Sequence, residues 1–358
     1  MEKTQTNAAS VTRRIARGLI DTAVATPPFA LGYLSAADFA QYQIRFSDRL
    51  LGAIAFGATA PAIAVPACPY AWVDMPLLAG DAMFEVWTSP QPVVRDGEDG
   101  LTAAHNHDLL FGRLYLEPDC RLDKASCAAY SRIFDFIDRR GYGHLLRAWN
   151  YVPQINEDED GLERYARFNM GRHDAFVANK RIIGTGTPAA SALGSRGKHL
   201  TIYFLAAKRA GQLVENPRQT SAFHYPAQYG PRSPTFARAM LLQAEGEQQL
   251  FVSGTSSIVG HVTMHAGDAA AQARETVANL LTVIAQAQLA GFDTSSPHAR
   301  LLLKAYLRRP DDLAMAQACL KQAFGAATQI VYLQADICRA DLLVEVEAAY
   351  INGSAPVI

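Results

Sequence analysis

The sequence predicts an α+β protein of two domains, in which mixed β-sheets carry helices on one face. The chain has 358 residues, which is long for a single hydrophobic core. Its first half reads mostly as strands and loops, and its last third alternates in the order β-α-β-α-β-β. Helices that follow strands in this way pack on one face of a sheet and leave the other face free for a ligand or partner.

The first half begins with an uncharged stretch at 51–73. This stretch contains three prolines and two glycines, so we expect two short strands around a turn at 57–61 rather than a membrane helix. Residues 110–118 alternate and end at a proline, which is typical of a strand. A further strand is expected at 199–207.

Two helices are expected between these strands. The first covers 123–141, where Asp123 can cap the helix and Gly141 can end it. The second covers 162–177 and follows an acidic run that is typical of a solvated loop.

The last third is more regular. We expect a strand and turn at 248–265, helices that end at glycines, and three further strands. The expected helices are 268–291 and 310–325, and the expected strands are 300–309, 328–337 and 341–350. We therefore divide the chain into a polar tail (1–18), an N-terminal α+β domain (19–197) and a C-terminal domain (198–358).

Composition excludes several classes of function. A formal net charge of −1 gives no indication of nucleic acid or an anionic membrane as partner. The start of the chain is polar and lacks the apolar stretch of a signal peptide. The five cysteines are scattered and show no metal-ligand spacing, so we expect reduced thiols in a cytoplasmic protein.

The strand expected at the C-terminal end carries an unusual pattern. One face is apolar, and the other carries Glu345 and Glu347 at strand spacing. Either this second face is solvated, or it lines a pocket in which one glutamate does chemistry.

Other candidate motifs are weak. His261 and His265 are four residues apart, but they lie in a strand and turn, and no glutamate completes a zinc motif. The stretch 184–195 is rich in glycine and serine but lacks the lysine of a phosphate-binding loop. We expect no metal and no cofactor.

A set of arginines and tyrosines among apolar residues is more informative. Arginine forks bind carboxylates bidentately, and buried arginines need an anionic partner. The candidates for binding an anionic substrate are Tyr151, Arg164, Arg172, Tyr225 and Arg232.

The last third resembles the Rid/YjgF imine-deaminase family. The matching segments are "LFVSGTSSIVG", "LLKAYLRRPDDLAMAQACLKQAFG" and "DLLVEVEA". The resemblance implies a Rid/YjgF-like (chorismate mutase-like) C-terminal fold. The arginine that those deaminases use for the substrate carboxylate falls near Ile330 here, so imine deamination is the less favoured alternative.

The chain from about residue 20 to its end resembles the chorismatase family. The motifs are "RAWNYVPQIN", "ERYARFNMGR", "NPRQTSAFHYPAQYGPRSPTFARA", "SGTSSIVGH" and "CRADLLVEVEA". The resemblance implies cleavage of chorismate to pyruvate and a ring product, either 3-hydroxybenzoate, with or without 4-hydroxybenzoate, or a dihydroxycyclohexadiene carboxylate formed by hydrolysis. A binding module without activity is a further alternative.

The same resemblance assigns roles to single residues. Glu345 matches the catalytic glutamate, Cys338 a cysteine of hydroxybenzoate-forming members, and Ser256 a small position that selects the product. Glu345 can donate a proton at neutral pH only if burial raises its pKa, and we expect Glu347 to be structural. In Rid/YjgF proteins, which are trimers, neighbouring subunits supply the walls of each site. Because the N-terminal half can supply these walls within one chain here, we expect a monomer.

Overall fold

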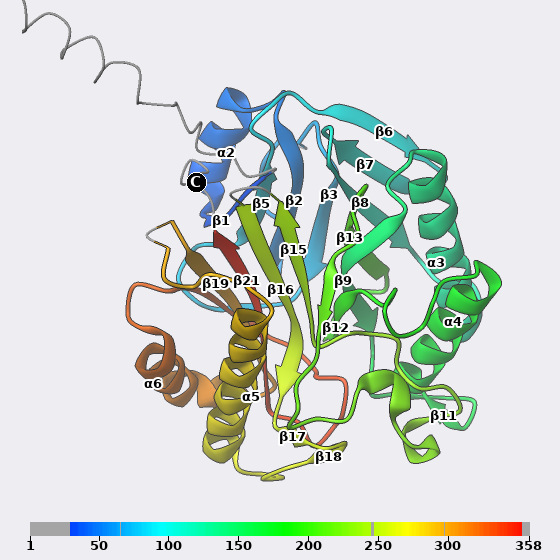
Figure 1. Cartoon of the computed structure of the whole chain (residues 1–358), viewed down its shortest axis with the longest axis vertical. Coiled ribbons are helices and arrows are strands. Elements are labelled where there is room, and N and C mark those ends of the chain that lie inside the picture. The colour runs from blue at the N-terminus through cyan, green and yellow to red at the C-terminus, as the bar shows by residue number, and fades with distance from the viewer. Residues whose placement is uncertain (1–28, 65, 245–246, 297, 353–358) are drawn as a thin grey trace, which may run out of the picture.

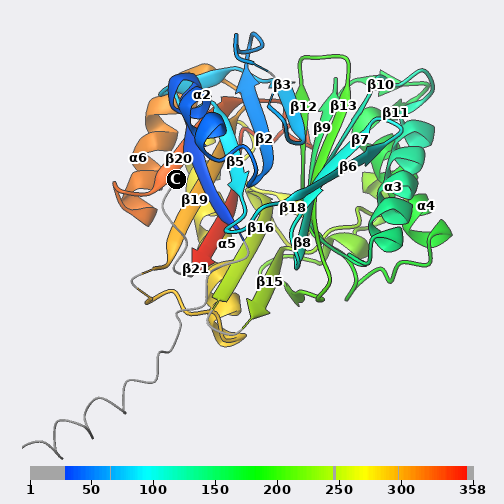
Figure 2. The ribbon, with the colours of Figure 1, turned by 90° about the horizontal axis from the view of Figure 1, so that it is seen from above.

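The computed structural model describes residues 29–64, 66–244, 247–296 and 298–352, so the expected tail, 1–18, lies outside the described residues. Three larger β-sheets and their helices form the fold (Figure 1). Turned by 90°, the molecule shows α3 and α4 on one side, α5 and α6 on the other, and the sheets between them (Figure 2). The predicted α+β class with mixed sheets is confirmed.

The six-stranded sheet has the order β12-β9-β13-β8-β7-β6. Helices α3 (Leu122–Arg139) and α4 (Arg164–Ala178) pack on its outer face and share an apolar core with it. The strands are β6 (Val94–Glu98), β7 (Leu101–His105), β8 (Leu109–Leu116), β9 (His144–Pro153), β12 (Ala189–Ser195) and β13 (Leu200–Ala207).

Helices α3 and α4 were both expected, but their starts differ in detail, and the helix at Ala36–Arg45 in the same half was not expected. Asp123 does not cap α3; its carboxylate accepts hydrogen bonds from the Arg121 side chain, and Arg121 is the capping residue. Gly141 follows the helix with φ +77°, a conformation that favours glycine. Helix α4 begins only at Arg164, because Leu162–Glu163 pairs as a short strand, β11.

The seven-stranded sheet has the order β14-β15-β16-β21-β19-β20-β4. Helices α5 (Ala269–Leu289) and α6 (Leu313–Phe324) cover one face, and the order β16-α5-β19-α6-β20-β21 confirms the pattern predicted for the last third. The strands are β4 (Leu77–Ala79), β14 (Gln212–Val214), β15 (Ala239–Ala244), β16 (Glu247–Ser256), β19 (Arg300–Leu307), β20 (Gln329–Gln334) and β21 (Val344–Asn352).

A four-stranded sheet with the order β1-β5-β2-β3 completes the core. Helix α2 (Ala36–Arg45) packs on it, and the Ser35 side chain caps this helix by accepting from the Asp38 N–H. The stretch 51–73 contributes to two strands, as predicted, but these strands pair in parallel and residues 58–69 separate them, so they are not joined by the turn expected at 57–61. No helix in the described part of the chain is long and apolar enough to cross a membrane. The strands are β1 (Ala30–Leu34), β2 (Leu50–Gly57), β3 (Tyr70–Asp74) and β5 (Phe84–Thr88).

Short elements lie at the ends of the sheets. They are the strand pairs β10–β11 (Asp158–Glu159, Leu162–Glu163) and β17–β18 (Ile258–Val259, Val262–Thr263), and the 3₁₀ helices Ala222–His224, Ala227–Tyr229 and Pro310–Asp312.

The domain boundary expected between residues 197 and 198 falls in the wrong place. Strand β13, which follows it, pairs with both β8 and β9 in the middle of the six-stranded sheet. Strand β4 in turn crosses from the N-terminal half to pair with β20. One apolar cluster contains Trp87, Phe111 and Tyr306 from all three sheets, so the inner faces share a single core.

Candidate active site

The C-terminal strand β21 is buried on both faces. Val344, Val346 and Ala348 pack toward α5 and α6, as the apolar alternation predicts. Glu345 and Glu347 point the opposite way, toward the N-terminal half, and each is 3% exposed. The second face of this strand is therefore not solvated; it holds two carboxylates in the interior.

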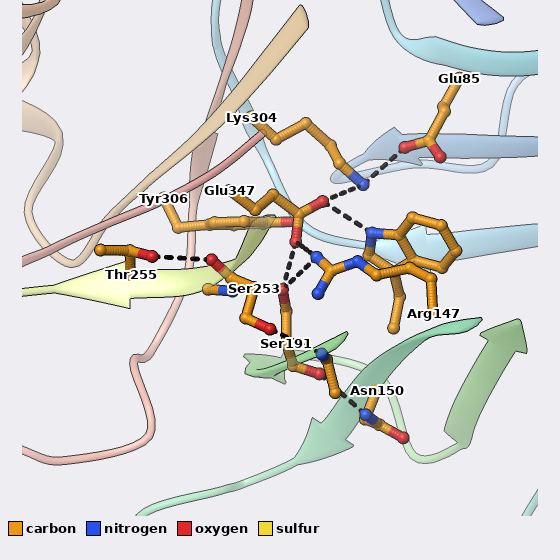
Figure 3. A network of polar contacts seen from close by, with 12 residues as sticks. Glu85, Arg147, Asn150, Ser191, Ser253, Thr255, Lys304, Tyr306 and Glu347 are labelled. Carbon is orange, nitrogen blue, oxygen red and sulfur yellow. Dashed lines mark hydrogen bonds and ion pairs between the residues drawn. The ribbon is translucent and has the colours of Figure 1, made fainter. Parts of the chain in front are cut away.

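Glu347 is held by four donors. Its oxygens accept from Arg147 at 2.9 Å, from the Trp149 indole N–H at 2.8 Å and from the Ser191 hydroxyl, and they form an ion pair with Lys304 at 2.7 Å. Figure 3 shows the carboxylate among these groups. Although burial opposes ionisation, Lys304 and Arg147 outweigh it and lower the pKa of Glu347. Glu347 is thus a buried, fully hydrogen-bonded anion.

Lys304 extends this network to a second carboxylate. Its ammonium group lies 2.5 Å from Glu85 and donates to the Tyr203 hydroxyl at 2.7 Å. Burial disfavours the charged lysine, but the charges of Glu347 and Glu85 outweigh it and raise its pKa well above the usual value. Two carboxylates and two cations, Lys304 and Arg147, therefore balance one another inside the protein.

Glu345, two residues earlier, has very different surroundings. It accepts from the Ser256 hydroxyl at 3.1 Å, and the Cys338 thiol is 4.0 Å from the same oxygen. Burial raises the pKa of Glu345 to about 8; the Ser256 hydrogen bond and Arg147 lower it, and the charge of Glu347 raises it. Glu345 is therefore a protonated acid at neutral pH, as its predicted role requires.

Cys338 is also neutral. Burial, followed by the neighbouring Glu345, raises the pKa of its thiol to about 12. Since the thiolate is the nucleophilic form of cysteine, Cys338 presents a neutral, weakly polar thiol to Glu345 rather than a nucleophile.

A cavity of about 500 Å³ opens above Glu345. It lies between α4 with the strand before it, the loop of residues 222–236, and the ends of β16 and β21. A side chain at Gly254 would collide with Glu345, because its Cβ would lie 2.0 Å from Oε1. The lining residues that carry polar side chains are Glu163, Tyr165, Tyr225, Gln228, Tyr229, Arg238, Ser256, Cys338, Arg339 and Glu345.

Two arginines on the lining have donors to spare. Arg238 donates from one nitrogen to the Thr220 carbonyl and the Tyr225 hydroxyl, and Arg339 donates to the His261 carbonyl at 2.9 Å. Among the described residues, no acceptor reaches Nε of Arg238 or Nη2 of Arg339. Buried guanidinium N–H groups without an acceptor favour an anionic ligand.

The tyrosines hold these arginines in place. The Arg339 guanidinium lies 4.0 Å from the centre of the Tyr229 ring, and that of Arg238 lies 5.7 Å from the Tyr225 ring. The Tyr229 hydroxyl donates to the same His261 carbonyl that Arg339 contacts. These contacts fix both cations against the cavity wall.

Of the residues expected from the sequence, Glu345, Cys338, Ser256 and Tyr225 line the cavity. Tyr151 does not; it is buried in the core, and its hydroxyl lies 3.1 Å from that of Tyr306.

Three expected arginines also lie elsewhere, because each already has other neighbours. Arg164 pairs with Glu159 at 2.6 Å, and Arg232 is half exposed beside Asp174. Arg172 is buried with its guanidinium 4.8 Å from the Tyr130 ring; its Nε and Nη2 also lack an acceptor among the described residues, but it does not line the cavity.

The cavity is lined instead by Arg238, Arg339 and Tyr229, in place of Arg164, Arg172, Arg232 and Tyr151, which were expected there. Arg339 directly follows Cys338 in "CRADLLVEVEA", and Arg238 lies in the motif "SPTFARA". Both motifs were recognised, but an arginine in a loop has no periodicity that shows which way it points.

The assembled groups form a site for acid catalysis on an anion. One neutral carboxylic acid lies at the floor, two cations lie on the wall, and aromatic rings close the sides. In the described part of the chain, no three His, Cys, Asp or Glu side chains gather as metal ligands would.

Three kinds of comparison identify similar proteins. The family model described as "Chorismatase FkbO/Hyg5-like, N-terminal" matches residues 85–206. The chain is 38% identical over 284 residues to 3-hydroxybenzoate synthase of Streptomyces hygroscopicus, covering 77% of this chain and 83% of that protein. It is 36% identical over 332 residues to a chorismatase of Streptomyces rapamycinicus, covering 90% and 98%. A crystal structure of a chorismatase superposes with a TM-score of 0.81 at 32% identity, covering 91% and 99%.

Proposed function

This chain belongs to the chorismatase family and cleaves chorismate, and we propose that Glu345 is the acid that starts the cleavage. The observation that carries the proposal is the state of Glu345: a buried carboxylic acid, protonated at neutral pH, at the floor of a cavity whose wall carries two arginines. A general acid with a pKa near the working pH is the most effective proton donor.

Chorismate fits the charge of this cavity. It carries two carboxylates, and the cavity is lined by Arg238 and Arg339, each of which keeps a buried N–H that no acceptor in the described part of the chain reaches. We assign the carboxylate contacts to these two arginines. Positive charge near Glu345 would lower its pKa. When the two arginines bind the carboxylates of the substrate, their charges are neutralised, and Glu345 can keep its proton until it donates it.

The first step is proton transfer to carbon. Glu345 donates its proton to the methylene carbon of the enolpyruvyl ether, which gives an oxocarbenium ion and the Glu345 carboxylate. The bond between the ether oxygen and the ring then breaks, and the side chain leaves as pyruvate.

The second step decides the ring product. We propose that the neighbouring ring hydroxyl attacks the ring carbon that loses pyruvate, returns its proton to Glu345 and forms an arene oxide, which aromatises to 3-hydroxybenzoate. The curated relative that is named 3-hydroxybenzoate synthase supports this product. Ser256 and Cys338 lie beside the Glu345 carboxyl, where the hydroxyl proton has to return.

The test is to incubate the purified protein with chorismate and to separate the products by chromatography. We expect pyruvate and 3-hydroxybenzoate in equal amounts, and a loss of about 10²- to 10⁴-fold in rate for Glu345→Gln. Undiminished pyruvate release by Glu345→Gln would overturn the role of Glu345. A dihydroxylated, non-aromatic product would replace the second step by attack of water.

We further propose that the protein is a monomer in the cytoplasm. All walls of the cavity come from one chain, and all five cysteines are free. Sedimentation of the purified protein as a trimer would contradict the monomer, and recovery of the native protein from a secreted or periplasmic fraction would contradict the compartment.

A further inference from the structure

The two carboxylates of β21 are linked physically as well as by sequence. Ser191 connects them: its hydroxyl donates to Glu347 and accepts from the Gly254 N–H at 2.9 Å. Gly254 in turn lies directly against the Glu345 carboxyl. A short path of contacts therefore runs from Glu347 through Ser191 and Gly254 to Glu345.

The neighbouring strands fix both side chains in register. Glu347 lies opposite Lys304 of β19, while Glu345 lies between Tyr306 of β19 and Ser256 of β16. Because both glutamates are on one face of one strand, their carboxyl groups are held close together in an interior where water does not screen their charges.

From this arrangement we propose that Glu347 is a positioning residue for the reaction: its ionised carboxylate, held on the same face of β21, acts together with the burial of Glu345 to keep the proton on Glu345. The inference rests on the proposed role of Glu345 and deepens it. It assigns to the network of Figure 3 a function in catalysis in addition to its role in holding the halves together.

The charges around Glu345 decide whether its pKa is raised or lowered. The charged or titratable groups that act on Glu345, lie opposite it or line the cavity with it are Glu347 (β21), Arg147 (β9), Tyr306 (β19), Cys338 and Arg339 (the loop before β21), Arg238 (before β15), and Glu163 and Tyr165 (β11 and α4). Lys304 (β19) and Glu85 (β5) follow behind Glu347. Of the charged groups, Glu347 and Arg147 act most directly on the pKa of Glu345, in opposite directions.

Glu347 can serve this purpose because it does not titrate near neutral pH. Lys304 and Arg147 hold it ionised, and Glu85 balances the remaining cation. The network therefore holds two carboxylates and two cations, and of these Glu347 and Arg147 act on Glu345. Two like groups with pKa values pushed apart have separate tasks: one carries the proton and the other carries the charge.

The test compares variants whose charges change in opposite directions. Glu347→Gln removes the anion and leaves an excess cation, so the alkaline limb of kcat/KM for chorismate cleavage should move to lower pH by about one unit. Arg147→Met removes a cation, while Lys304, Trp149 and Ser191 still hold Glu347. Its limb should move to higher pH.

Glu85→Gln is the matched control. It removes an anion of the same network, but on the far side of Lys304, so its shift should have the sign of Glu347→Gln and be smaller. Damage to folding lowers the amount of active protein in all three variants but cannot move the limb in two directions. Infrared spectroscopy gives a second measurement for any of these variants that no longer cleaves chorismate. The band of the protonated Glu345 carboxyl, which is assigned by its loss in Glu345→Gln, reports the same titration without turnover.

The outcomes separate this inference from the proposed function. Opposite shifts for Glu347→Gln and Arg147→Met support it. Limbs that coincide with that of the wild-type protein, or that move together, overturn it while chorismate cleavage by Glu345 stands. A Glu345→Gln variant that keeps full activity would instead remove the premise.

Discussion

The network around Glu347 and the cavity around Glu345 are adjacent regions on one strand, and they differ in how their polar groups are satisfied. In the network, each carboxylate has cations and hydrogen-bond donors from the protein itself. In the cavity, the acid holds its own proton and arginine N–H groups wait for an acceptor. In the network, Nη1 of Arg147 also lacks an acceptor among the described residues, but both carboxylates are paired, which indicates a structural or positioning task. The protonated acid beside arginines with open donors indicates where a ligand binds.

The largest effect, a loss of stability, is expected from a variant that breaks the network. Glu347→Gln removes one partner from a buried ion cluster and leaves Lys304 with Glu85 alone and Arg147 with no carboxylate, so the free energy of unfolding should fall by about 3–5 kcal/mol. Urea denaturation followed by circular dichroism measures it. The control Glu98→Gln breaks a surface pair with Arg139 and should lower this free energy by at most about 1 kcal/mol. Equal losses would show that the network is not stronger than a surface pair.

The second prediction uses the opposite state of Glu345. Its pKa is raised from 4.5 to about 8 on folding, so its contribution to stability is complete below pH 4.5 and is lost as pH rises toward 8. Glu345→Gln lacks this titration. The variant should therefore gain stability relative to the wild-type protein by up to about 1.4 kcal/mol per pH unit between pH 5 and 8.

Urea denaturation of both proteins at pH 5, 6, 7 and 8 measures this difference, because all other titrating groups are shared. A constant difference across the series would mean that Glu345 is ionised in the folded protein.

The contrast between the two regions also explains what the sequence could predict. The alternation of β21 places Glu345 and Glu347 on one face, and the motif "CRADLLVEVEA" distinguishes their roles by resemblance. A period of two cannot show whether that face meets water or another sheet. Lys304, the main partner of Glu347, lies in β19, and Arg147 lies in β9, some 200 residues away along the chain.

The arginines show the same limit from the other side. Arg164 and Arg172 were expected on the site because they lie on one helix, yet a helix position fixes a direction and not a partner. Arg164 forms an ion pair with Glu159, and the Tyr130 ring packs against Arg172. Likewise, the strand 199–207 was predicted correctly, but its pairing with β8 and β9 depends on long-range contacts that its own sequence does not show.

The third prediction tests the open donors of the cavity. Arg339→Met removes one carboxylate contact, and a charge-assisted hydrogen bond contributes about 1.5–3 kcal/mol, so KM for chorismate should rise about 10- to 100-fold. Steady-state kinetics measures it. Arg309→Met, which changes an exposed arginine paired with Asp312, is the control and should leave KM unchanged. An unchanged KM for Arg339→Met would move the carboxylate contact to another residue.

The smallest expected effect refines the state of the acid itself. Ser256 donates to Glu345 and thereby lowers its pKa, so Ser256→Ala should move the alkaline limb of kcat/KM to higher pH by about half a unit. The free energy of this shift is smaller than that of one strong hydrogen bond to a charged group. Ser257→Ala is the matched control, because the Ser257 hydroxyl is buried next in the chain but donates to the Met264 carbonyl. A limb that moves to lower pH in Ser256→Ala would mean that the hydroxyl accepts the proton of Glu345 instead of donating to it, and the two residues would then share the proton along a single hydrogen bond.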